Sequence, residues 1–154
     1  MDKRLINDMP VLWDKVKPYV EYLESMGFKT THQMAYFHPG NEENYTFFNG
    51  WQYQLPNRRN DWEVVVDLVS YTGELKLEIY KFSIIKPPKH YWCGDNKSKP
   101  PFILTNLRDD INECYESTIV DNLTDFKKEI GKFFNTIKKY NEKIKKHELE
   151  KDFT

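Results

Sequence analysis

The chain of 154 residues is 39% hydrophobic and 31% charged, and its formal net charge is −1. This length suits one domain that buries a core without a metal or a disulfide, and no run approaches the ~18 apolar residues that a membrane span needs. A charge so close to zero excludes a nucleic-acid binder that relies on bulk positive charge.

The cysteine content and the first residues indicate where the protein works. Cys93 and Cys114 are too few for the disulfide scaffold of a secreted domain. The residues after Met1 lack the continuous apolar core of a secretory signal. We therefore expect a cytoplasmic protein with free thiols and no membrane contact.

An N-terminal helix is predicted over residues 8–27. Asp8 can cap it, Pro10 suits its first turn, and Gly27 supplies a left-handed stop after which Phe28 can fold back. The apolar residues at helical spacing are Leu12, Val16, Tyr19, Val20 and Leu23.

Residues 29–85 change to a period of two, which is typical of antiparallel strands. We predict four strands, over 30–38, 45–55, 61–71 and 74–85, because turn-forming residues separate these runs. Thr72-Gly73 joins the third and fourth strands in a tight hairpin.

A two-residue loop fixes the register of this hairpin, because it places Tyr71 opposite Glu74. One side is then apolar and belongs to the core, and the other is mixed and half exposed. The predicted core-side pairs are Leu68 with Leu77 and Val66 with Ile79; the pairs on the other side are Val69 with Lys76, Asp67 with Glu78 and Val65 with Tyr80.

Residues 86–101 form a long loop with a proline pair at each end, a type of loop that is often functional. A C-terminal helical part follows over 106–146 and ends in a long amphipathic helix. A sheet that is apolar on one side needs a covering layer, which the helices at the chain ends can supply. The sequence therefore predicts a single α+β domain over 1–154, a two-layer sandwich with a four-stranded antiparallel sheet.

The chain is rich in aromatic residues, with 10 Phe, 10 Tyr and 4 Trp. Rings interleaved with polar residues supply a large contact area at low entropic cost, although they can equally fill the core. The candidate binding residues are Tyr36, Tyr45, Phe47, Trp51 and Tyr53 on the sheet and Tyr91 and Trp92 in the long loop.

A second pattern combines Asp67 with Glu74-Leu75-Lys76 and Glu78. It resembles the core of the PD-(D/E)xK nucleases. The resemblance implies a metal-dependent nuclease in which Asp67 and Glu74 bind Mg²⁺ and Lys76 polarises the attacking water. The alternative is a charged, solvated sheet face that discourages edge pairing.

Other site chemistries find little support in the sequence. His90-x-x-Cys93 offers zinc ligands, but the remaining candidates, Cys114, His32 and His38, lack a paired spacing. Neither a nucleophile elbow nor a glycine-rich phosphate loop is present. We expect no cofactor and no metal.

The favoured hypothesis is a non-enzymatic interaction protein that binds and modulates a host or cognate protein, or a small ligand, through the aromatic sheet face and the 86–101 loop. Abundant Lys, Asn, Ile and Tyr suggest an AT-rich genome, which fits an inhibitor encoded by a phage or mobile element. Two alternatives stay open: the nuclease, and a single-stranded nucleic-acid binding module that uses the rings and the lysine-rich last helix. The oligomeric state is not predicted.

Overall fold

A computed structural model describes residues 10–38, 41–56, 62–71, 74–87, 89, 100–106 and 117–152, with 10–12, 32–38, 41–46, 71 and 74 described by their backbone alone. Most of the predicted loop 86–101, and the first part of the helical region 106–146, therefore lie outside the described residues. The elements in chain order are α2 (Pro10–Ser25), β1 (Lys29–His38), β2 (Asn41–Gln54), β3 (Trp62–Tyr71), β4 (Glu74–Tyr80), β5 (Ser83–Ile85), β6 (Ile103–Thr105), β7 (Ser117–Val120) and α3 (Leu123–Lys151).

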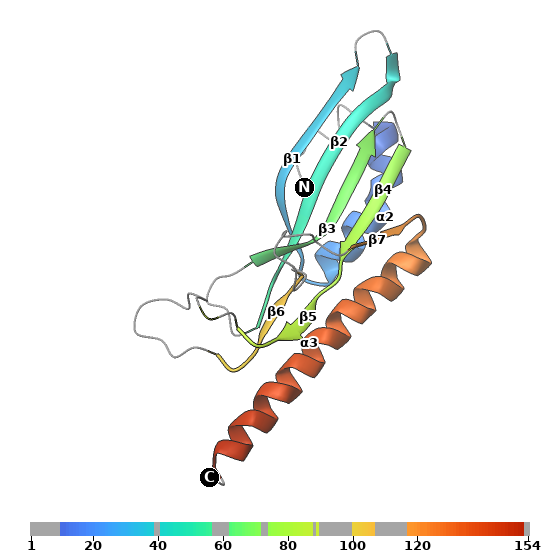
Figure 1. Cartoon of the computed structure of the whole chain (residues 1–154). Coiled ribbons are helices and arrows are strands. Elements are labelled where there is room, and N and C mark those ends of the chain that lie inside the picture. The colour runs from blue at the N-terminus through green and yellow to red at the C-terminus, as the bar shows by residue number, and fades with distance from the viewer. Residues whose placement is uncertain are drawn as a thin grey trace.

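The architecture is α+β, as predicted, but the main sheet has five strands rather than four. Its order is β1-β2-β3-β4-β7, and the four pairings are all antiparallel. The predicted strand 74–85 is divided, because β4 ends at Tyr80 and β5 pairs with β6 in a separate two-stranded ribbon (Figure 1). The added strand, β7, was missed because four residues are too few to display a period.

The β3–β4 hairpin has the predicted register over six pairs, from Tyr71–Glu74 to Val66–Ile79. The predicted pair of Val65 with Tyr80 is not among them, and Val65 is buried rather than half exposed. Tyr71 lies opposite Glu74, Leu68 opposite Leu77, Val66 opposite Ile79, Val69 opposite Lys76 and Asp67 opposite Glu78. Leu68, Val66, Leu77 and Ile79 are all buried, so this side faces the core. The hydrophobic pattern and the two-residue length of the turn therefore predicted these strand pairs correctly.

The end of α2 also follows the prediction. Gly27 has a φ of 92°, the left-handed conformation that a residue without a Cβ adopts at no steric cost. The amide of Phe28 donates to the carbonyl of Leu23, and the amide of Gly27 donates to the carbonyl of Glu24. These two hydrogen bonds end the helix, and the ring of Phe28 packs in the core.

The C-terminal helix, α3, begins at a side-chain cap and is longer than predicted. The amide of Asp125 donates to Oδ1 of Asn122 at 2.8 Å, which satisfies one of the free donors at the helix start. The helix continues to Lys151, beyond the predicted end at 146. No helix in the described part of the chain is long and apolar enough to cross a bilayer.

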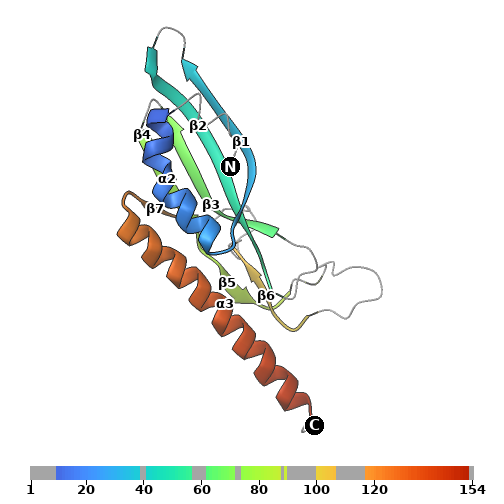
Figure 2. The ribbon, with the colours of Figure 1, turned by 180° about the vertical axis from the view of Figure 1, so that it is seen from behind.

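Both helices cover the same face of the main sheet (Figure 2). They also contact each other, because the rings of Tyr19 and Tyr22 on α2 lie edge-on to the ring of Phe126 on α3, with centroids 5.2 and 6.1 Å apart. Burial, assisted by the Asp121 carboxylate, raises the pKa of the Tyr19 phenol. The fully buried side chains of Val16, Val20 and Leu23 complete the contact of α2 with the core.

One buried hydroxyl of the core has no hydrogen-bond partner in the described structure. Ser70 lies opposite Phe47 and Leu75 on the helix-covered face and is fully buried, and its Oγ is unsatisfied. Burying an unpaired hydroxyl costs about 1–3 kcal/mol. We therefore expect Ser70→Ala to raise the free energy of unfolding by about 1 kcal/mol in urea denaturation.

Thr30→Val is the matched control for Ser70→Ala. The Thr30 hydroxyl donates to Oδ1 of buried Asn49 at 2.6 Å, so its removal leaves a buried acceptor without this donor. This variant should lose about 1 kcal/mol. A loss of stability on Ser70→Ala would show that the hydroxyl is satisfied in solution.

Candidate functional site

The structure places three of the predicted binding rings in or against the core. Phe47 and Trp51 lie on the helix-covered face and are 0% and 1% exposed. Tyr53 is half buried between helix and sheet, with its ring 5.2 Å from that of Phe134 on α3. A partner could reach Phe47 or Trp51 only if the fold opened.

The other predicted rings are described by their backbone or not at all. Tyr36 lies opposite Thr46, and Tyr45 lies opposite Phe37, in the part of the β1–β2 hairpin that extends past the last β2–β3 pair (Figure 1). Tyr91 and Trp92 are outside the described residues.

The side of the sheet opposite the helices is named here the outer face, and no described helix packs on it (Figures 1 and 2). Directly paired residues of antiparallel strands share a face, so the register identifies its members. The central described residues of the outer face are Phe48, Gly50, Asp67, Val69, Lys76, Glu78, Tyr80, Ser117 and Ile119. Lys29 and Trp62 lie on the same face farther along β1 and β3, with the Lys29 ammonium group 4.5 Å from the ring centroid of Trp62.

Apolar side chains are accessible on the outer face. Phe48 and Val69 are paired neighbours on β2 and β3, and both are half buried. Ile119 on the edge strand β7 is 67% exposed, which is unusual for a large aliphatic side chain in a sheet. Lys76 is exposed and Glu78 is half buried, so both signs of charge lie beside these apolar groups.

The centre of the outer face holds a buried carboxylate. Asp67 is 7% exposed, and its Oδ2 accepts a hydrogen bond of 2.5 Å from the phenol of Tyr80. A Cβ at the neighbouring Gly50 would lie 2.5 Å from Oγ1 of Thr31, but 3.4 Å, an ordinary contact distance, from Oδ1 of Asp67. The close packing at Gly50 therefore involves Thr31 rather than Asp67.

The register separates the residues of the nuclease pattern. Glu74 lies opposite Tyr71, four positions along β3 from Asp67, a separation of about 13 Å at about 3.3 Å per residue. Carboxylates that share one ion must approach within about 5 Å, because metal–oxygen distances are only about 2.0–2.6 Å. The backbone positions of Asp67 and Glu74 are therefore not adjacent in the sheet, and the residue opposite Asp67 is Glu78.

Most of the candidate metal ligands lie outside the part of the chain whose side chains the structure describes. Among the described residues, no three His, Cys, Asp or Glu side chains gather closely enough to hold a metal ion. Of the zinc candidates, His90, Cys93 and Cys114 lie outside the described residues, and His32 and His38 are described by their backbone alone.

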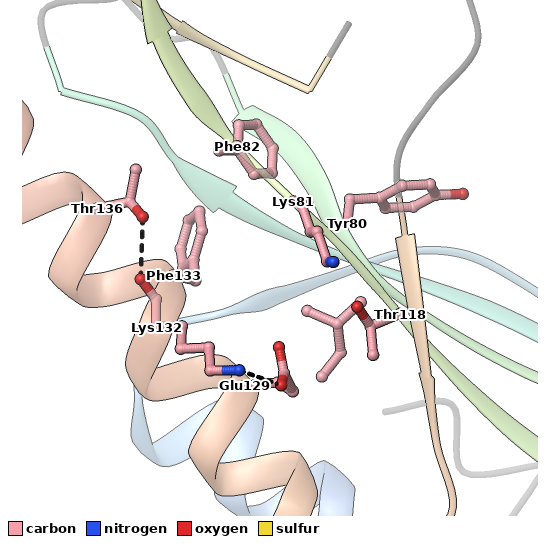
Figure 3. Close-up of a pocket in the computed structure, with 9 residues that line it drawn as sticks. Tyr80, Lys81, Phe82, Thr118, Glu129, Lys132, Phe133 and Thr136 are labelled. Carbon is pink, nitrogen blue, oxygen red and sulfur yellow. Dashed lines mark hydrogen bonds and ion pairs between the residues drawn. The ribbon is translucent and has the colours of Figure 1, made fainter. Parts of the chain in front are cut away.

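A groove of about 450 Å³ lies between the main sheet and α3 (Figure 3). The segment that joins β4 to β5 contributes Lys81 and Phe82 to its wall, and β7 contributes Thr118. Its remaining lining residues are Ile79 and Tyr80 on β4 and Glu129, Lys132, Phe133 and Thr136 on α3. Figure 3 shows the Lys81 ammonium group and the Thr118 hydroxyl on the sheet side, across from Glu129 and Lys132.

Sequence reasoning missed both Ile119 and the groove. Ile119 is a single aliphatic residue in an acidic segment, and only its pairing with β4 places it on the outer face. The groove joins residues about 50 positions apart in the chain, from Lys81 to Lys132, so no local pattern marks it. Both features depend on long-range contacts, namely the pairing of β7 with β4 and the packing of α3 against the sheet.

Comparisons with known proteins give no functional lead. No protein-family model matches the chain, and neither a curated protein nor a solved structure is significantly similar to it. The proposals below therefore depend on the geometry of the described residues.

Proposed function

We propose that the protein is a non-enzymatic interaction protein that binds a partner protein through its outer face. The observation that carries this proposal is the exposure of Ile119, 67%, on the edge strand β7 of a sheet face that has no described helix on it and that also presents the half-buried Phe48 and Val69 on β2 and β3. Accessible apolar anchors within a polar surround are typical of protein interfaces. The outer face thus replaces the buried rings that the sequence suggested.

The charges of the outer face favour a protein over a nucleic acid. Asp67 and Glu78 stand side by side at its centre, and Lys76, opposite Val69, is the basic residue nearest to them in the register. Two carboxylates repel a phosphate backbone, whereas a protein surface can offer an apolar group to Ile119 and an opposite charge to each of Lys76 and Glu78.

The β3–β4 hairpin gives this surface a fixed shape. Its six described pairs follow one register without a bulge, and its core side is buried under both helices. A preformed surface loses little conformational entropy on binding, so a few exposed apolar contacts can give a specific complex.

Affinity capture with a charged substitution tests this proposal. The wild-type protein, Ile119→Lys and Leu149→Lys are immobilised and exposed to a lysate of the native host, and retained proteins are quantified by mass spectrometry. Removing an apolar anchor of an interface costs about 2 kcal/mol or more, so Ile119→Lys should reduce capture of a specific partner at least about tenfold.

Leu149→Lys is the matched control, because Leu149 is also an exposed aliphatic residue, 52% exposed, but lies near the end of α3. It should retain the partner. A captured set that is the same for the wild-type and Ile119→Lys proteins, or that is lost equally with Leu149→Lys, would exclude the outer face as the binding surface. Thermal unfolding of all three proteins confirms that each is folded.

A further inference from the structure

The groove between the main sheet and α3 has the size and the partial enclosure of a small-molecule site. Its volume of about 450 Å³ lies within the roughly 300–1,000 Å³ of typical ligand pockets. Three separate segments build it: the β4–β5 region, β7 and α3. It lies between the two layers, on the helix-covered side of the sheet, whereas Ile119 faces the opposite side, so the inference does not depend on the proposed function.

The inner part of the groove is apolar. Ile79 and Phe133 are 2% and 4% exposed, and Phe82 is half buried beside them. The rings of Phe82 and Phe133 meet edge-on with centroids 5.3 Å apart, so the aromatic wall is held in place by its own packing. A ligand here would bury an aromatic or branched apolar body.

The rim of the groove carries one uncompensated positive charge. Lys132 forms an ion pair of 2.8 Å with Glu129, whose side chain is only 17% exposed. Lys81 forms no hydrogen bond or ion pair within the described structure, and Figure 3 shows its ammonium group directed toward the space between Thr118 and α3. Thr118 adds a hydroxyl that also has no described partner.

We propose that this groove binds a small amphipathic carboxylate, with its apolar body against Phe82 and Phe133 and its carboxylate on Lys81 and Thr118. One free ammonium group matches a single negative charge. A phosphate would bring up to two negative charges close to the Glu129 carboxylate, which repels anions. A monoanion is repelled less than a dianion and therefore suits the lining better.

Titration of the ¹⁵N-labelled full chain with 3-phenylpropionate, followed by amide chemical shifts, tests this assignment. Saturable shifts should concentrate at Lys81, Phe82, Thr118 and residues 129–136. A charge-assisted hydrogen bond contributes enough to the binding free energy that its loss should weaken binding about tenfold. We therefore expect this loss of affinity both for the neutral analogue 3-phenylpropanamide with the wild-type protein and for 3-phenylpropionate with Lys81→Gln.

Lys138→Gln is the control variant, because Lys138 is an exposed lysine of α3 outside the groove lining. The affinity of this variant for 3-phenylpropionate should equal that of the wild type. Three results would overturn the proposal. They are a dissociation constant weaker than about 10 mM for the acid, equal affinity for acid and amide, and equal weakening by Lys81→Gln and Lys138→Gln. Because none of these results involves Ile119, they leave the test of the outer face unaffected.

Discussion

Replacing Phe126 by alanine is expected to lower the free energy of unfolding by about 3–5 kcal/mol, the range for emptying a buried aromatic site. Phe126 is fully buried, and its ring makes T-shaped contacts with the rings of Tyr19 and Tyr22. Its removal therefore leaves a cavity at the junction of α2, α3 and the sheet. The loss should exceed that of any single surface substitution, because this residue ties the two helices together.

Urea denaturation followed by circular dichroism measures the Phe126→Ala effect, and Leu149→Ala is the control. Leu149 belongs to the same helix but is half exposed, so its truncation should change stability by no more than about 0.5 kcal/mol. If Phe126→Ala lost less than about 1 kcal/mol, α2 and α3 would not pack through this ring in solution.

Adding a side chain at Gly50 is expected to lower the free energy of unfolding by about 1–3 kcal/mol, the usual cost of overpacking. A Cβ at this position would lie 2.5 Å from Oγ1 of Thr31, which is itself held by a 2.9 Å hydrogen bond to the Gly50 carbonyl. The same Cβ would lie 3.4 Å from Oδ1 of Asp67, an ordinary contact distance, so the loss should come from the contact with Thr31.

A double-mutant cycle separates this clash from other effects of the substitution. Thr31→Ala removes the clashing oxygen and one hydrogen bond, so the double variant should be at least about 1 kcal/mol more stable than the sum of the single losses predicts. Gly131→Ala in α3 is the control: a Cβ there meets nothing within 4 Å, and stability should rise by about 0.5–1 kcal/mol. Additive losses at Gly50 and Thr31 would contradict the predicted contact.

The sequence was sufficient to predict the end of α2 and the β3–β4 pairing. The stop at Gly27 depends on backbone freedom, and the β3–β4 register depends on a two-residue turn with a period of two. Both causes act within a few residues of the chain. The layer arrangement followed, because an apolar sheet face and two amphipathic helices leave few ways to bury their surfaces.

The distribution of the aromatic rings could not be predicted in the same way. A period of two assigns alternate residues of β2 to opposite faces, but it does not say which set the helices cover. Phe47 and Trp51 proved to be core residues, while Phe48 lies on the outer face. Which face is covered depends on where α3 packs on the sheet, and α3 is far from β2 in the sequence. The same packing of α3 forms the groove around Lys81.

The two proposed surfaces use different sides of the molecule. Ile119 on β7 faces outward with Glu78, whereas its neighbour Thr118 lines the groove against α3. The short strand β7 therefore contributes to both. A partner on the outer face and a carboxylate in the groove would contact consecutive residues of one strand.

Site-specific photo-crosslinking tests most directly whether the outer face is the binding surface. A benzoylphenylalanine residue is introduced at position 119 or, as the control, at position 149, and the protein is irradiated in the native host. We predict that position 119 gives a discrete adduct containing one partner protein and that position 149 does not. Adducts at 149 alone, or at neither position, would contradict the proposal that the outer face binds a partner.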